Sequence, residues 1–318
     1  MSGGCFGGSS SGRVRALAVL LAWWALAGAL PLTAAPGGED PPDDTIIRAK
    51  VFLVNLFVSA TSGGDYAADL KAEDFEITED GKKQEILYFR NLSQTQEIPL
   101  TIAVLVDTSG SVKDKLSQEI ATASIFFRKI LRPNKDVGAL IEFHSEVVLV
   151  QDFTDNPDRL DRALDKLKPG GETSLYDAVY LAAEEKLSKE AGRKVILILS
   201  DGADTSSKVK KETAIKAAQR VDALIYGIGV RSGMFPSDFG VLQNFCKETG
   251  GRFFSPEPTR EALQETFDII MKDIAHQYNM AYEPADQARD GKFRKIKITL
   301  RGKRLKLSYR KGYFTPED

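Results

Sequence analysis

The sequence is poor in the side chains that most often carry covalent chemistry. Only two of its 318 residues are cysteine and only two are histidine. So few cysteines provide no disulfide framework, and the fold must be stabilised by packing. So few histidines leave little choice of an imidazole base for a serine nucleophile. These scarcities count against a disulfide-rich scaffold and against a histidine-assisted hydrolase.

A strong charge of one sign is also lacking. The chain has 43 basic and 45 acidic residues and a formal net charge of −2. No electrostatic argument on the whole chain therefore points to nucleic acid or to an acidic substrate. Hydrophobic residues make up 42% and charged residues 28% of the sequence, as in ordinary globular proteins, which excludes disordered and collagen-like classes. Any charged function must be local.

The N-terminus has the pattern of a secretory signal peptide. Arg13 and Arg15 precede the apolar run "ALAVLLAWWALAGAL", and small residues follow it. We predict a signal over residues 1–35 that ends at Ala35, with Ala27 or Ala29 as alternative ends. The apolar run is shorter than the roughly 20 residues that span a bilayer. We therefore expect cleavage, no transmembrane span in the mature chain, and a secreted or periplasmic (envelope) location; an uncleaved anchor is the alternative.

Removal of this signal leaves Cys246 as the last cysteine. It lies in "FGVLQNFCKETG" beside apolar residues. Such a cysteine is expected to be a small buried hydrophobe rather than a reactive thiol.

Composition and pattern divide the rest of the chain into a linker and three folded segments. A proline-rich acidic stretch is followed by alternating strand-like runs, then by apolar strands that alternate with helical patterns, and finally by strand-like runs again. The predicted parts are a linker at 36–44, an N-terminal β segment at 45–97, an α/β segment at 98–275 and a C-terminal β segment at 276–318.

Runs such as "LTIAVLV" and "KVILILS" are apolar throughout, as in parallel strands that are covered on both faces. The predicted fold class is therefore α/β, with a doubly wound, mostly parallel, Rossmann-like sheet. Neither β flank is large enough to fold alone. We predict that the two flanks pair into one small β-sandwich-like unit, with the α/β segment inserted between them.

Oxygen-bearing side chains follow the predicted parallel strands. "DTSGS" follows the first strand, "SDG" follows another, and "GGETSLYDA" is a glycine-hinged loop between them. Ligands bind at the carboxyl ends of strands in such sheets, so these loops bring two carboxylates and three hydroxyls to one rim. They are Asp107, Ser109, Ser111, Thr173 and Asp201. Ligation by oxygen alone suits a hard cation, Mg²⁺ before Mn²⁺ or Ca²⁺.

These segments also support a family resemblance. "VLVDTSGSV", "GGETSLYDA" and "VILILSDGADTSS" resemble the three segments of the metal-ion-dependent adhesion site of von Willebrand factor type A domains. The resemblance covers about residues 98–275, and the flanks resemble those of a secreted bacterial subgroup. It implies that the five oxygen-bearing residues are the metal positions, that the protein is not an enzyme, and that a carboxylate of a partner protein completes the coordination of the metal in cell adhesion.

Other readings of the same residues stay open. "DTSGS" alone could be a capped helix start. A metal-dependent phosphohydrolase would need a second acid at the position of Ser109, and a serine hydrolase would have to use His144 or His276. An envelope scaffold with a structural metal is a third class. The basic tail alternates with apolar residues, which favours a half-solvated strand over nucleic-acid binding; contact with the envelope stays possible.

Overall fold

The computed structural model describes residues 52–95, 98–114, 116–230 and 239–317. The predicted signal at 1–35 and linker at 36–44 lie outside these residues. None of the described helices is long and apolar enough to cross a membrane.

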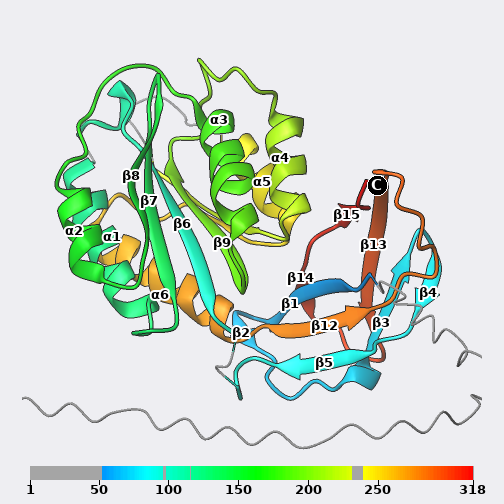
Figure 1. The fold of residues 1–318 in the computed structure, drawn as a ribbon. Coiled ribbons are helices and arrows are strands. Elements are labelled where there is room, and N and C mark those ends of the chain that lie inside the picture. The colour runs from blue at the N-terminus through cyan, green and yellow to red at the C-terminus, as the bar shows by residue number, and fades with distance from the viewer. Residues whose placement is uncertain (1–51, 96–97, 115, 231–238, 318) are drawn as a thin grey trace, which may run out of the picture. The chain divides into compact units, whose positions relative to one another are not determined.

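The central sheet has six strands in the order β11-β10-β9-β6-β7-β8, and all neighbours are parallel except β7 and β8 (Figure 1). Every residue of β6 is buried, which explains its unbroken apolar run. The strands are β6 (Leu100–Asp107), β7 (Val137–Phe143), β8 (Val147–Thr154), β9 (Arg193–Ser200), β10 (Leu224–Gly229) and β11 (Phe253–Phe254).

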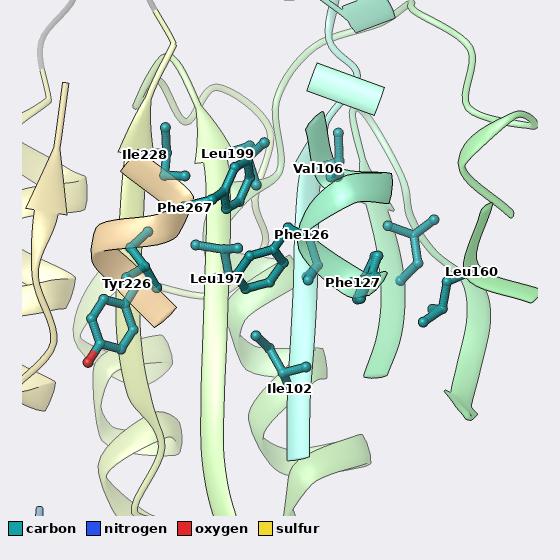
Figure 2. Close-up of a cluster of buried hydrophobic side chains, with 14 of the residues drawn as sticks. Ile102, Val106, Phe126, Phe127, Leu160, Leu197, Leu199, Tyr226, Ile228 and Phe267 are labelled. Atoms are coloured by element: carbon teal, nitrogen blue, oxygen red, sulfur yellow. The ribbon is translucent and has the colours of Figure 1, made fainter. Parts of the chain in front are cut away.

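Helices cover both faces of this sheet. Successive residues of a strand point to opposite faces, so Ile102 and Val104 pack with α1, α2 and α6, whereas Ala103 and Leu105 pack with α3, α4 and α5. Figure 2 shows the first of these cores, in which Phe126 and Phe267 come from α1 and α6. The helices are α1 (Leu116–Ile130), α2 (Pro157–Leu164), α3 (Leu175–Tyr180), α4 (Lys211–Arg220), α5 (Gly240–Thr249) and α6 (Arg260–Ala275).

One helix differs from its sequence pattern. The spacing predicts a single helix over 175–189, but α3 continues as a π-helical turn over Leu181–Lys186 and a 3₁₀ turn over Leu187–Lys189. The buried residues along this segment still follow helical spacing. The apolar pattern therefore does not distinguish α-helical from π-helical or 3₁₀ hydrogen bonding. Cys246 is buried on α5, as expected.

The flanking segments form two antiparallel sheets. One has the order β14-β1-β12-β5, with β2 beside β1, and the other has the order β15-β13-β3-β4 (Figure 1). The strands are β1 (Val54–Ser62), β2 (Asp65–Tyr66), β3 (Phe75–Glu79), β4 (Lys82–Gln84), β5 (Tyr88–Asn91), β12 (Tyr278–Tyr282), β13 (Phe293–Leu300), β14 (Lys306–Ser308) and β15 (Gly312–Phe314).

Strands from the two ends of the chain pair directly. β1 pairs with β12 from Val54 opposite Tyr282 to Val58 opposite Tyr278, and β3 pairs with β13. Side chains of both sheets share one apolar core. The predicted sandwich built from both flanks is therefore confirmed, while the exact domain boundaries stay a prediction.

Two details of these flanks depend on particular residues. The "EDGK" turn joins β3 to β4, with Asp80 and Gly81 at positive φ, as a two-residue hairpin requires. The last apparent strand, "RLKLSYRKGYF", divides into β14 and β15, which belong to different sheets. Tyr309, between them, is buried, and its hydroxyl accepts a hydrogen bond from the backbone N–H of Ile298.

A buried carboxyl group tests the sandwich. Tyr282 and Tyr313 both donate to Oε2 of Glu79, at 2.7 and 3.0 Å. We expect Tyr282→Phe to lower the free energy of unfolding by about 1–3 kcal/mol, because a buried acceptor loses a donor. Tyr88→Phe, on the partly exposed β5, is the control. Equal urea denaturation midpoints for the two variants would contradict the arrangement.

Candidate metal centre

Two acids follow neighbouring parallel strands at the same edge of the central sheet. Asp107 is the last residue of β6 and is fully buried. Asp201 follows β9 directly and is 8% exposed. β6 and β9 pair in parallel, with Val106 opposite Leu199. The structure therefore brings both carboxylates to one rim, where ligands of such sheets bind.

Asp107 is held by a hydrogen bond at each of its carboxylate oxygens. The backbone N–H of Ser109 donates to Oδ1 at 2.9 Å, and the hydroxyl of Ser200 donates to Oδ2 at 2.7 Å. Ser200 itself accepts from the N–H of Gly202 at 3.0 Å. The last residue of β9, supported by Gly202 of the following loop, thus fixes the carboxylate that ends β6.

The two serines of "DTSGS" lie side by side. Their hydroxyl oxygens, Oγ of Ser109 and Oγ of Ser111, are 3.0 Å apart. Ser109 is buried and Ser111 is exposed. A short 3₁₀ turn over Gly110–Val112 follows and leads toward α1. The turn therefore presents a pair of hydroxyls between the buried acid and the solvent.

The loop that carries Thr173 is joined to both acidic loops. The N–H of Gly170 donates to the carbonyl of Thr108 at 2.7 Å, and the N–H of Gly110 donates to that of Gly171. Thr205 then brackets Thr173, because its hydroxyl accepts from the Thr173 N–H while its own N–H donates to the Thr173 carbonyl. These bonds hold Thr173 against the other two loops.

Gly171 lets the Thr173 loop lie close to the turn between β7 and β8. Its φ is +77°, and a Cβ atom at this position would lie 2.6 Å from the Ser145 hydroxyl oxygen. Any other residue would clash and would adopt the left-handed conformation at a cost. A glycine is therefore favoured where the Thr173 loop passes the turn between β7 and β8, which contains Ser145.

The site is electrostatically strained in the absence of a cation. The pKa of Asp107 is raised to about 6, chiefly by burial and also by the negative charge of Asp201, although hydrogen bonds from Ser109 and Ser200 oppose the shift. An opposite charge between the two carboxylates would relieve this. No three acidic, histidine or cysteine side chains gather closely enough to hold a metal by themselves within the described ranges. A cation here would need the hydroxyls as well, and the donor set fits a hard divalent ion.

Two hydroxyl residues of this site do not appear among the sequence predictions. Ser200 binds Asp107 directly and Thr205 binds the Thr173 loop. Both lie in the quoted segment "SDGADTSS". A hydroxyl at the last position of a buried strand, where apolar residues are the rule, is the signal that could have identified Ser200.

The hydrogen bonds recorded for the two histidine rings are to groups other than the hydroxyls of Ser109 and Ser111. Nδ1 of His144 accepts from the N–H of Glu146, and the ring of His276 hydrogen-bonds the carbonyl of Lys272. Ser109 stands where a phosphohydrolase would need its second acid. These contacts favour neither of the hydrolytic readings.

Comparison with known proteins agrees with this geometry. A family model described as the von Willebrand factor type A domain matches residues 101–268, which is more than half of the chain. The chain belongs to the von Willebrand factor type A domain family. The resemblance predicted for about residues 98–275 is confirmed, and membership of this family supports a role as a protein-interaction module.

Individual relatives are distant. An uncharacterized protein of Borreliella burgdorferi is 24% identical over 229 residues, which cover 64% of this chain and 62% of that protein. The match therefore spans less than two thirds of the relative.

Solved structures that are similar to the chain match it at low identity. BatB from Bacteroides thetaiotaomicron is 16% identical (55% of this chain, 98% of that chain, TM-score 0.46), and the vWF domain of the pili tip protein Mfa5 from Porphyromonas gingivalis is 17% identical (56% and 95%, TM-score 0.47). Proximal thread matrix protein 1 from the mussel byssus, with a zinc-occupied MIDAS motif, is 18% identical (58% and 48%, TM-score 0.49). At these TM-scores the family model alone supports the assignment.

The raised pKa of Asp107 predicts how the stability of the metal-free protein depends on pH. The folded state holds this proton up to about pH 6, whereas the unfolded state loses it near 3.8. The folded state binds more protons in this window, so the free energy of unfolding falls as the pH rises. One pKa unit corresponds to about 1.4 kcal/mol, and we expect a melting temperature several degrees lower at about pH 7 than at about pH 4.5.

Asp107→Asn removes this titration and serves as the control, in which the pH dependence should be smaller. Calorimetric melting curves in metal-free buffer measure both proteins. A wild-type melting temperature that rises over this pH range would contradict a buried, strained carboxylate.

Proposed function

We propose that this chain binds Mg²⁺ at the rim of its type A domain and, through the bound cation, a carboxylate of a partner protein. The observation that carries the proposal is that Asp107 and Asp201 lie at one rim together with hydroxyl groups. Ser109, Ser111 and Thr173 are the other proposed ligands. Mn²⁺ or Ca²⁺ could take the place of Mg²⁺ with the same donors.

The carboxylates and the hydroxyls have different proposed roles at the cation. Two carboxylates balance the charge of a divalent cation, and neutral hydroxyls complete its surroundings without adding negative charge. Bound in this way, the cation would keep enough positive potential to attract a further anionic oxygen. The hydrogen bonds from Ser109 and Ser200 hold Asp107 in one orientation before the cation arrives.

Export would place this site where it can meet such a partner. The apolar N-terminal run and the small residues after it support secretion or a periplasmic location. An acidic side chain of an envelope or extracellular protein is then the proposed ligand. Nucleic acid is not proposed as a ligand, because the exposed Lys295 and Lys297 of β13 alternate with the buried Ile296 and Ile298, and Arg294 is itself buried.

The metal ligands can be tested by calorimetric titration with Mg²⁺. We expect Asp107→Asn with Asp201→Asn to weaken Mg²⁺ binding at least about tenfold, because the site loses both charges that balance the cation. Asp158→Asn with Asp268→Asn, which changes two exposed acids on the helices, should leave binding unchanged. Equal Mg²⁺ affinity in both double variants would refute the site.

The partner chemistry needs a separate experiment. Envelope extract is passed over the immobilised protein with Mg²⁺ and with chelator, and captured proteins are retested after their acidic residues are amidated. Capture that needs both Mg²⁺ and free carboxylates supports the proposal. Turnover of phosphate esters that disappears in Asp107→Asn would instead favour a phosphohydrolase, and a metal that raises only the melting temperature would favour a scaffold.

A further inference from the structure

A third acid lies buried near the proposed metal centre. Glu119 is on α1, the helix that follows "DTSGS", and its exposed fraction is 2%. Neither of its carboxylate oxygens has a hydrogen-bond partner among the residues that the structure describes. Buried polar atoms are nearly always paired, so this side chain calls for an explanation.

Glu119 borders a small cavity at the rim of the sheet. The cavity has a volume of about 30 Å³, and its walls include Gly229 and Val230 at the end of β10 and Pro258 and Thr259 before α6. By the same measure one water molecule needs roughly 10–15 Å³. The cavity therefore has room for one or two waters, and the free oxygens of Glu119 are acceptors for them.

One strand, β9, separates the cavity wall on β10 from Asp107 on β6. Gly229 of β10 is in register with Ser200 of β9, and the N–H of Val230 donates to the carbonyl of Ser200 at 2.9 Å. The hydroxyl of the same Ser200 binds Asp107. Figure 2 shows Ile228, another wall residue, beside Leu199 on the neighbouring strand.

The three acids also act on one another electrostatically. The pKa of Glu119 is raised to about 8, chiefly by burial and also by the negative charges of Asp107 and Asp201. Since the described residues contain no group of three such side chains in direct reach of one ion, Glu119 is placed to act on a cation through its charge and not as a direct ligand.

An apolar residue would serve the packing of α1 better. Glu119 lies on the buried stripe that also contains Leu116, Ala123 and Phe126, and an unpaired acid in such a stripe destabilises the fold. This loss of stability is offset if Glu119 contributes to binding of the cation.

We propose that Glu119 is a third carboxylate of the metal centre, a positioning residue that binds water in the cavity beside it and, through its charge, strengthens the binding of the divalent cation. The inference rests on the proposed function, because it requires Mg²⁺ at Asp107 and Asp201. A cation at this rim lowers the pKa of the Glu119 carboxyl group, so Glu119 ionises as the cation binds and helps the centre to retain it when no partner carboxylate is bound.

The test uses the whole chain and measures the Mg²⁺ dissociation constant and the melting temperature in metal-free buffer. We expect Glu119→Gln and Glu119→Leu to raise the dissociation constant at least about tenfold. Glu119→Asp keeps the charge and should lose less. Glu119→Leu should also raise the metal-free melting temperature, because an unpaired buried acid is replaced by an apolar side chain. A merely structural role would not separate affinity from stability in this way.

Glu142→Gln is the matched control, since Glu142 is also largely buried and its pKa is also raised by burial, but it lies on β7. Its Mg²⁺ dissociation constant should stay within about twofold of the wild-type value. If the wild type binds Mg²⁺ and folded Glu119→Gln binds it equally well, the inference is overturned while the proposed function stands. If the wild type does not bind Mg²⁺, the proposed function fails and the inference fails with it.

Discussion

The account depends on one constraint, the removal of the Asp107 carboxylate from water at the end of a strand that is itself entirely buried. A carboxylate in this place is unfavourable unless hydrogen bonds or a cation compensate it. Ser109 and Ser200 compensate it in part. The loop that carries Thr173 is held at the same rim, because Gly170 and Gly171 form backbone hydrogen bonds with Thr108 and Gly110.

The burial of Asp107 follows from the double cover of the sheet. Helices on both faces exclude water from β6 and from most of β9, so the acids at the ends of these strands lie next to a low-dielectric core. The antiparallel sandwich built from the two flanks has a core of its own. β1 and β12, which stand on opposite sides of the inserted domain in the sequence, pair directly in it.

Much of this arrangement is readable from the sequence because it depends on periodicity. The apolar runs before Asp107 and Asp201 predict buried parallel strands, and parallel strands place both acids at one edge. The alternation in "RKIKITL" likewise predicts β13. Pairing between the flanks follows from their need to bury one face each.

Other features depend on contacts that no pattern contains. On α1 the helical spacing is satisfied whether position 119 or Ile120 faces the core, and only the packing shows that Glu119 is buried. Between β14 and β15, the buried Tyr309 hydroxyl accepts a hydrogen bond from Ile298 of β13, a contact with a residue 11 positions earlier that the strand pattern of 304–314 does not reveal. The hydrogen bond from Ser200 to Asp107 joins residues 93 positions apart.

The most direct measurement of the central claim is anomalous diffraction from crystals of this protein grown with Mn²⁺, which takes the same oxygen ligands as Mg²⁺ and scatters more strongly. The account predicts an anomalous peak between Asp107 and Asp201, within coordination distance of the hydroxyls in "DTSGS". An empty rim at a Mn²⁺ concentration that produces peaks elsewhere on the molecule would contradict it.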